Sequence, residues 1–391
     1  MELLLADRMH DTPETFIQQI LAIAKNREII SFAGGLPNAN FFPVKGVKKA
    51  ALEVFERQRG SVLQYSNTEG EIELREWIAT RYREKGLEVS AENIIITNGS
   101  QQGLDLMAKV FVNPGDSVLI EKPGYLGAIQ SLALYQPVFR GIPLKDSGMD
   151  IEVLQEACST IKAKMLYMVP TFQNPSGITY SAQNRRNISE IAKENSIVLI
   201  EDDPYGELRF SGKQPPSFAH YLPEQTVLFG SFSKTIAPGF RLGWIAAPGW
   251  LRDTLLVAKQ AADLHTSSFT QQIIARFLET NDLDAHLQKI IAVYGSQCQA
   301  MLAAVEEYLP KDITTTRPEG GMFLWGRLPE GKDAMALFKE AVKEQVAFVP
   351  GAAFYATPEK NNCFRLSFSC VDTATIQEGM QRLKRALDRF L

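Results

Sequence analysis

The sequence predicts an α/β protein in which helices sandwich a largely parallel sheet, with a smaller α+β domain at the carboxyl end. Up to about residue 290, continuous apolar runs alternate with amphipathic ones, which is typical of a layered α/β domain. Beyond that point the order of the segments changes. The 391 residues, 45% of them apolar, also exceed what one ordinary core needs. We therefore expect one large domain and one smaller one.

The predicted strands are short apolar segments separated by helical patterns. Most of them lack polar alternation, which indicates strands that are covered on both faces, as in a parallel sheet. They are Asn93–Ile96, Ser117–Ile120, Met165–Val169, Ser196–Ile200, Thr226–Phe229 and Leu242–Ala247. Helical patterns lie between them, including Glu71–Glu84, Gln101–Val110 and Ala182–Glu194.

The two ends of the chain differ from its middle. A long helix near Ile291–Tyr308 precedes three apolar segments and a terminal amphipathic helix, an order that suggests α+β structure. The segments are Gly321–Trp325, Val346–Val349 and Phe364–Phe368. Residues 1–45 combine an amphipathic stretch, Thr15–Lys25, with a turn-rich segment, Phe32–Pro43. We expect residues 1–45 to form an arm on the small domain that borders the cleft, residues 46–290 the large domain, and residues 291–391 the small one.

Composition excludes several classes of partner. The net charge of −4 lacks the basic excess that binding to a nucleic-acid backbone requires. The four cysteines form no Cys-x-x-Cys pair and the four histidines show no metal-ligand spacing, so we expect no metal. No apolar run is long enough to span a bilayer, and the first residues do not resemble an export signal. A cytoplasmic protein without a membrane or nucleic-acid partner is expected.

Lys234 is the residue most indicative of function, in the run from Gly230 to Trp244. A phosphorylated aldehyde cofactor needs a lysine amine as its covalent anchor, and desolvation or nearby cations must deprotonate that amine. The pyridine nitrogen of such a cofactor works as an electron sink when a buried carboxylate keeps it protonated. Asp202 follows an apolar segment and fits that role, whereas Asp203 is less well placed because a proline follows it. Tyr205 then reaches the ring oxygen, and together these residues describe a pyridoxal phosphate site.

The cofactor's phosphate needs backbone amides at a helix start, hydroxyls and a cation. The segment Thr97–Gly103 supplies a strand, a tight turn and a helix, with Ser100 and Gln101 at the start of the helix. Ser231 and Arg241 flank Lys234 and complete the cradle. Taken alone, Asn-Gly-Ser is also an ordinary turn and helix cap.

Two further segments follow predicted strands and fit around the ring. Tyr125, in Glu121–Tyr125, has a side chain that can stack on the pyridine face. Asn174, in Phe172–Gly177, can donate a hydrogen bond to the ring oxygen. Local sequence leaves both open, since an aromatic packed under a loop and an ordinary Asn-Pro turn would look the same.

The chain resembles the class I and II aminotransferases, which are fold type I pyridoxal phosphate enzymes, over essentially its full length. Four motifs follow one another along the chain in that family's order. They are Asn-Pro-Ser-Gly, Asp-x-x-Tyr after a strand, Ser-x-Ser-Lys with a downstream arginine, and Phe-Arg-Leu-Ser. Other segments resemble the 2-aminoadipate, kynurenine and multi-substrate subgroup. They are Ser31–Pro37, Gln64–Gly70, Gly99–Gln102 and Arg317–Phe323.

The resemblance implies a role for each matching residue. Lys234 forms the Schiff base and moves the proton, Asp202 pairs with the pyridinium, and Tyr205 and Asn174 bind the ring hydroxyl. Ser100, Gln101, Ser231 and Arg241 hold the phosphate, and Tyr125 stacks on the ring. Arg365 clamps the substrate carboxylate with its planar guanidinium, while Gly35 allows close backbone approach. The alternative for Arg365 is a surface charge on an edge strand.

Tyr65 carries a different implication, because in similar enzymes the tyrosine of this segment reaches the phosphate in the neighbouring subunit. Its alternative is an ordinary exposed loop tyrosine. If Tyr65 has this role, the active sites lie at a twofold interface and a homodimer is required for full activity.

The expected reaction is transamination between an L-amino acid and a 2-oxo acid, with 2-oxoglutarate as the expected acceptor and ping-pong kinetics. A lyase reaction on an amino acid stays open, because the cofactor motifs do not fix which bond breaks. A non-catalytic effector module is the other alternative, although residues 1–45 are too few for a DNA-binding domain. No arginine lies between Arg8 and Arg27 to bind an acidic side chain. Residues that can instead border a broad apolar pocket are Phe16, Gln18, Leu36 and Phe41.

Overall fold

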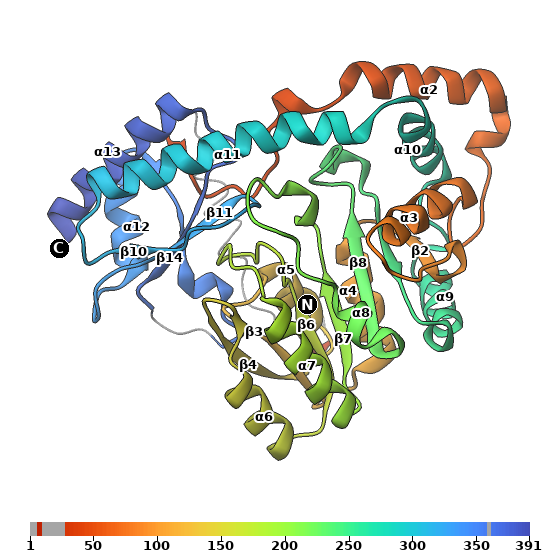
Figure 1. The fold of residues 1–391 in the computed structure, drawn as a ribbon, viewed down its shortest axis with the longest axis horizontal. Coiled ribbons are helices and arrows are strands. Elements are labelled where there is room, and N and C mark those ends of the chain that lie inside the picture. Colours follow the sequence, from red (N-terminus) through yellow and green to blue (C-terminus); the bar gives the residue numbers. More distant parts are fainter. Residues whose placement is uncertain (1–5, 10–27, 358–360) are drawn as a thin grey trace, which may run out of the picture.

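The computed structural model describes residues 6–9, 28–357 and 361–391. An eight-stranded sheet forms its centre, in the order β2-β9-β8-β7-β6-β3-β4-β5 (Figure 1). The strands are β2 (Ile94–Thr97), β3 (Ser117–Lys122), β4 (Val138–Lys145), β5 (Gly148–Met149), β6 (Ala163–Met168), β7 (Val198–Asp202), β8 (Thr226–Ser231) and β9 (Gly243–Ala246). Neighbouring strands from β8 to β4 pair in parallel, while β9 is antiparallel to both of its neighbours. The largely parallel sheet is therefore confirmed.

The sheet is covered on both faces, and alternate residues of one strand belong to different apolar clusters. In β6, Met165 and Tyr167 pack into the cluster that also holds α4, whereas Leu166 and Met168 join the cluster that holds α6 and α7. All four are buried. Because neither face of the strand meets water, every position favours an apolar side chain, and the sequence of the strand is a continuous apolar run.

The helices that accompany the large sheet are α2 (Val44–Gln58), α3 (Ile72–Glu84), α4 (Ser100–Phe111), α5 (Leu126–Ala133), α6 (Ile151–Thr160), α7 (Ala182–Glu194), α8 (Phe218–Tyr221), α9 (Gly249–Asp263) and α10 (Ser268–Thr280). Capping sets several of their starts, because a side-chain oxygen accepts a hydrogen bond from an unsatisfied backbone amide. Ser181 does this for α7 and Ser267 for α10. The three helices expected from the sequence agree with α3, α4 and α7 to within one residue at each end.

All six predicted strands are confirmed with shifted ends, and β4 is the one strand of appreciable length that the sequence pattern did not predict. This strand lies near the edge of the sheet, contains Pro143, and alternates between exposed and half-buried residues. It therefore lacks the apolar continuity of the inner strands.

A second, smaller sheet has the order β10-β11-β14-β13 and is antiparallel throughout. Its strands are β10 (Thr314–Thr315), β11 (Phe323–Arg327), β13 (Val349–Pro350) and β14 (Cys363–Ser367), and the helices α12 (Ala334–Lys343) and α13 (Thr373–Phe390) accompany it. The helix α11 (Leu283–Tyr308) runs from the α10 end of the molecule to α13 (Figure 1). One unbroken helix thus passes through residue 290, and the division there stays a prediction.

The described part of the arm lies against the small sheet side. Its strand β1 (Ile30–Ser31) pairs in parallel with β12 (Val346–Ala347), and the amide of Ser367 in β14 donates to the carbonyl of Phe32. The amphipathic stretch Thr15–Lys25, with Phe16 and Gln18, lies outside the described residues. In the described ranges, no helix has the length and apolar character needed to cross a bilayer.

Candidate active site

A cavity of about 480 Å³ lies at the carboxyl ends of the parallel strands, where ligands of open α/β sheets bind. Loops that follow β3, β6, β7 and β8 meet there, and the arm and β14 close the other side. Every predicted site residue except Tyr65 lines it: Gly35, Ser100, Gln101, Tyr125, Asn174, Asp202, Tyr205, Ser231, Lys234, Arg241 and Arg365. Side chains from widely separated parts of the chain therefore share one cavity.

Lys234 stands just after β8, in a turn that directs its amine across the cavity to the arm. Its Nζ donates to the carbonyl oxygen of Gly35 at 2.8 Å. Burial lowers the pKa of the Lys234 amine to about 8, and the positive charges of Arg365 and Arg241 add to that effect, with Cys370 opposing it. The amine is therefore much closer to its neutral, nucleophilic form at neutral pH than an ordinary lysine.

Asp202 is the last residue of β7, and its buried carboxyl group is 1% exposed. Tyr167 on the neighbouring strand β6 donates its hydroxyl to Oδ2 at 2.7 Å, while Oδ1 is buried without a hydrogen-bond partner among the described residues. Burial raises the pKa of the Asp202 carboxyl to about 7. Since the described residues give this acid no countercharge and leave one of its oxygens free, it suits a cationic group placed against it. Asp203, by contrast, accepts from the amide of Gly206 and does not line the cavity.

Asn174 joins the two sides of the cavity with its amide group. Its Nδ2 donates to the hydroxyl of Tyr205 at 3.2 Å, and its Oδ1 accepts from Nη1 of Arg365 at 2.8 Å. Asn174 and Tyr205 are both buried. One side chain thus places a phenol from the large sheet side next to a guanidinium from the small sheet.

Arg365 lies in an inner strand of the small sheet, since β14 pairs with β11 on one side and β13 on the other. Its Nη2 donates to the carbonyl of Ala33 at 2.7 Å, and its guanidinium lies over the rings of Phe323 and Phe354. Burial lowers its pKa to about 10. Its Nε has no hydrogen-bond partner in the part of the chain that the structure describes. The side chain is only 7% exposed, so the edge-strand surface charge that was the alternative does not describe this residue.

The start of α4 forms one wall of the cavity together with Arg241. Gly99 adopts a φ of 74°, which L side chains rarely take, and a Cβ built there would lie 2.7 Å from Nη2 of Arg241. Exposed backbone amides at a helix start, beside a guanidinium, form an anion-binding arrangement. Ser231, at the end of β8, accepts a hydrogen bond from the amide of Ser233 at 3.1 Å and lies in the same wall.

Gln101 and Tyr125 face the cavity from neighbouring elements. Nε2 of Gln101 donates to the carbonyl of Gly127 at 2.8 Å, which ties α4 to the start of α5. Tyr125 is half-buried, and burial raises the pKa of its hydroxyl to about 12, so it stays a neutral phenol. Its ring lies beside Gly127, where an added Cβ would meet the ring at 2.6 Å.

Comparison with known proteins gives a family for this arrangement. The sequence profile of the family "Aminotransferase class I and II" matches residues 28–383. The chain belongs to the class I and II aminotransferases. It is 41% identical to an aromatic-amino-acid aminotransferase of Thermococcus litoralis, over 95% of this chain and 91% of the relative.

Solved structures agree with this assignment. A multiple substrate aminotransferase from Thermococcus profundus has a TM-score of 0.93 at 40% identity, covering 98% of this chain and 97% of its own. An α-aminoadipate aminotransferase from Thermus thermophilus, solved with N-(5'-phosphopyridoxyl)-L-leucine, has a TM-score of 0.91 at 37% identity, covering 99% of this chain and 97% of its own. The protein is a pyridoxal phosphate-dependent aminotransferase with the fold type I architecture.

The side chains of this aminotransferase fit pyridoxal phosphate. The free Oδ1 of Asp202 offers the buried acceptor that a protonated ring nitrogen needs. Because Gly99 has no side chain, the Arg241 guanidinium lies against the start of α4, and a cation beside helix-start amides suits a phosphate. Lys234 lines the same cavity as both groups. The acid thus suits the ring nitrogen of one cofactor, the amine suits its aldehyde, and the anion site suits its phosphate.

Tyr65 stands apart from the aminotransferase's own cavity. It is 78% exposed and lies edge-on to the ring of His265, with 5.8 Å between the centroids. A single chain does not test a role in a neighbouring subunit, so that role stays a prediction.

Sequence reasoning missed several residues that shape the cavity, among them Tyr167, which does not line the cavity itself but bonds Asp202. A single hydroxyl inside the apolar strand Met165–Val169 was the available signal. Its meaning depends on the register of β6 and β7, which places Tyr167 opposite Ile200, two residues before Asp202. Lining residues that were also missed are Ala33, Leu126, Gly127, Gln130, Val169, Pro204, Ser233, Pro238, Val349 and Phe354.

Proposed function

We propose that this aminotransferase transfers the amino group of an L-amino acid, of the aminoadipate, aromatic or branched-chain type, to a 2-oxo acid. The proposed acceptor is 2-oxoglutarate, and the proposed kinetics are ping-pong. One observation carries the proposal: the Lys234 amine, the Asp202 carboxyl and the Arg365 guanidinium all line one cavity. The named relatives act on aromatic amino acids, on several substrates and on aminoadipate, which supports the donor class.

Each side chain has a definite task in this reaction. Pyridoxal phosphate, when bound, supplies an electron sink for the charge left when the substrate loses its α-proton. Lys234, with its lowered pKa, anchors the cofactor and then accepts and returns that proton. Asp202 keeps a negative charge opposite the ring nitrogen. Arg365 binds the substrate carboxylate through two parallel hydrogen bonds, a geometry for which its planar group is suited.

The remaining residues hold the cofactor in place. We assign the phosphate to the backbone at the start of α4 and to four side chains, Ser100, Gln101, Ser231 and Arg241. Asn174 and Tyr205 face the oxygen on the ring, and Tyr125 covers the ring face. In a homodimer, Tyr65 of each subunit is proposed to reach the phosphate site of the other, which makes the dimer the active form.

The walls of the cavity favour a donor with an apolar or aromatic side chain. Leu36, Val349 and Phe354 line it, whereas the cations among its described lining residues are Lys234, Arg241 and Arg365, each already assigned. Phe41, which was expected there, packs against the apolar core and is not among the lining residues. An acidic donor side chain therefore finds no further cation in the described walls. This argues against a dedicated aminoadipate preference.

A panel of amino donors tests the proposal directly. Aromatic and branched-chain donors are expected to give their 2-oxo acids only when a second 2-oxo acid is supplied, with parallel double-reciprocal lines. Continuous product formation without an acceptor would instead indicate a lyase, and no turnover with any donor would favour an effector module.

Lys234→Ala is expected to abolish turnover while the cofactor still binds through its phosphate. Substantial activity in that variant would remove Lys234 from its role.

A further inference from the structure

The loop between β6 and α7 decides where Asn174 lies. This loop, residues 169–181, begins at Val169, which lines the cavity, and carries Asn174 about midway. Asn174 contacts Tyr205 with one end of its amide and Arg365 with the other. Since both contacts depend on one side chain, a small displacement of the loop disturbs the ring oxygen site and the carboxylate site together.

Glu121, near the end of β3, accepts hydrogen bonds from the beginning, the middle and the end of this loop. Its Oε1 accepts from the amide of Val169 at 3.1 Å and from the hydroxyl of Tyr180 at 2.8 Å. Its Oε2 accepts from Nε2 of Gln173, next to Asn174, at 2.9 Å. Glu121 is 1% exposed and does not line the cavity. It therefore touches the loop without touching the space where a substrate binds.

Gln173 extends these contacts to a second loop of the site. Its Nε2 also donates to the carbonyl of Pro123 at 3.0 Å, two residues before Tyr125, and its Oε1 accepts from the amide of Ser176 at 2.8 Å. Gln173 is fully buried. The Glu121 and Gln173 pair thus fixes the turn that contains Asn174 and joins it to the segment that carries Tyr125.

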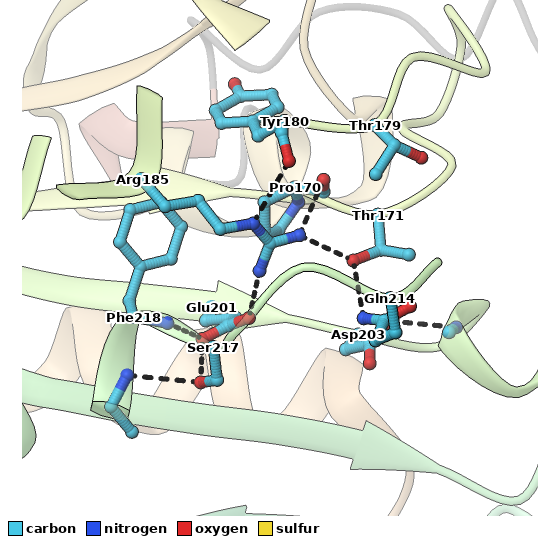
Figure 2. A network of polar contacts seen from close by, with 12 residues as sticks. Pro170, Thr171, Thr179, Tyr180, Arg185, Glu201, Asp203, Gln214, Ser217 and Phe218 are labelled. Atoms are coloured by element: carbon cyan, nitrogen blue, oxygen red, sulfur yellow. Dashed lines mark hydrogen bonds and ion pairs between the residues drawn. The ribbon is translucent and has the colours of Figure 1, made fainter. Parts of the chain in front are cut away.

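Arg185 holds the other side of the same loop (Figure 2). Its guanidinium pairs with Glu201 at 2.9 Å and donates to the carbonyl of Pro170 and the hydroxyl of Thr171. Its Nε donates to the carbonyl of Tyr180 at 3.3 Å. Tyr180 is therefore held by Arg185 through its backbone and by Glu121 through its side chain, and the loop has two buried polar anchors.

The two anchors differ in their charge balance. Arg185 and Glu201 neutralise each other, whereas the described residues place no cation in an ion pair with Glu121. Burial raises the pKa of the Glu121 carboxyl to about 7. A buried carboxyl without an ion pair is unfavourable for stability, and apolar residues of the same size fill a core at lower cost. Its three hydrogen bonds to the loop give a reason for its presence.

We propose that Glu121 is a positioning residue that, through Gln173 and Tyr180, holds Asn174 where its amide reaches both Tyr205 and Arg365. This inference rests on the roles proposed above for Asn174 and Arg365. It adds a residue that acts on cofactor and substrate binding without contacting either.

Glu121→Gln tests the proposal, because the new amide has one acceptor atom where the carboxylate has two. Whichever way that amide turns, at least one of the three donors faces another donor. The variant is expected to raise the dissociation constant of the apoenzyme for pyridoxal phosphate, and the KM for the amino donor, by at least about tenfold. Fluorescence titration of the apoenzyme measures the first constant independently of activity.

Thr226→Val is the matched control. Thr226 is buried at the amino end of β8, far along the strand from Ser231, and its hydroxyl donates to the carbonyl of Leu222 at 2.7 Å. The change removes one buried hydrogen bond and keeps the shape. It is expected to lower the unfolding temperature by a few degrees without moving either constant. Equal constants in Glu121→Gln and Thr226→Val would overturn the proposal.

Tyr180→Phe covers the case in which Glu121→Gln does not fold. It removes one of the three donors and keeps the ring, so both constants are expected to rise by a smaller factor than in Glu121→Gln. Wild-type constants in Tyr180→Phe, with Glu121→Gln unfolded, would also overturn the proposal. Wild-type enzyme that turns over no donor would contradict the proposed function alone, since the cofactor titrations would still report on the loop.

Discussion

At the scale of single residues, burial acts in opposite directions on the two ionisable groups that face the cofactor site. It lowers the pKa of Lys234 to about 8 and raises that of Asp202 to about 7, because a low-dielectric setting disfavours charge in both. The amine thereby gains nucleophilic character. The acid is only partly ionised at neutral pH, and a positive group placed against it favours the ionised form.

The lowered pKa of Lys234 predicts how pH controls cofactor loading. The neutral amine is the reactive form, so protonation below about pH 8 should slow the reaction of the apoenzyme with pyridoxal phosphate. Stopped-flow absorbance is expected to show a rate that rises with pH and levels off above about pH 8. A rate that continues to climb toward the ordinary lysine value of 10.5 would contradict the assigned environment.

Asp202→Asn removes the charge opposite the ring nitrogen while an oxygen remains to accept from Tyr167. The expected result is a fall in kcat of roughly 10²- to 10³-fold with the cofactor still bound. Asp203→Asn is the control, because this neighbouring carboxyl group lies outside the cavity. Steady-state kinetics on both variants decide the matter, and similar losses in the two would discard the pairing proposed for Asp202.

A residue's role could be predicted where its chemistry and its place in the sequence suffice to assign it. It could not be predicted where the role depends on which strands pair. Asp202 could be preferred to Asp203 because a proline follows the latter, and the cavity contains only the former. Tyr167 and Glu121 act through neighbours on other strands or loops. Their roles depend on sheet register and loop path, which one sequence does not contain.

At the scale of elements, the turn into α4 is the feature on which the proposed phosphate binding depends. Gly99 leaves the helix start open and lets the Arg241 guanidinium approach. Two requirements meet at this residue, a positive φ and an absent side chain. The glycine is therefore predicted to matter for binding and not only for folding.

Gly99→Ala tests this with a glycine of similar conformation as control. The added Cβ would lie 2.7 Å from Nη2 of Arg241, so the guanidinium must move and cofactor affinity is expected to fall by at least about tenfold. Gly115→Ala carries the same backbone strain, with a φ of 86°, but meets nothing within 4 Å. Fluorescence titration should leave its affinity unchanged. Equal losses would trace the effect to backbone strain alone.

The elements themselves were predictable to the extent that both faces are buried. The inner strands β3, β6 and β7 are predicted by their apolar runs. Strand β4 has no such run, because it is partly exposed and lies near the edge of the sheet. The beginning of α11 was also placed too late. Leu283 and Leu287 pack into an apolar cluster of the large sheet before the helix reaches the small sheet. The apolar face of α11 therefore contacts the large sheet side first and the small sheet side later.

At the scale of the whole molecule, the site exists because three parts of the chain meet. Lys234 comes from the large sheet side, Arg365 from the small sheet, and Gly35 from the arm, and hydrogen bonds connect all three regions. No one of these regions holds a complete site. The fold type was predictable, since the four motifs span the sequence in the family's order. The contacts that bring the three regions to one site became visible only in the structure.

The proposed dimer predicts that two inactive variants complement each other. Lys234→Ala lacks the amine, and Tyr65→Ala is expected to bind the phosphate weakly at limiting cofactor. A mixed dimer contains one site with an intact Lys234 and the partner subunit's Tyr65. Refolding the two variants together should therefore give mixed dimers that each have up to about half the activity of a wild-type dimer. Activity no higher than the sum of the separate variants would place Tyr65 outside the neighbouring site.

Borohydride reduction of the reconstituted enzyme, followed by digestion and mass spectrometry, tests most directly whether Lys234 carries the cofactor. The expected result is a phosphopyridoxyl group on the peptide that contains Lys234. Lys259 is the natural rival, because it is also fully buried, but it is paired with Asp263 and does not line the cavity. A label on Lys259 or another lysine, or no label at all, would contradict the assignment.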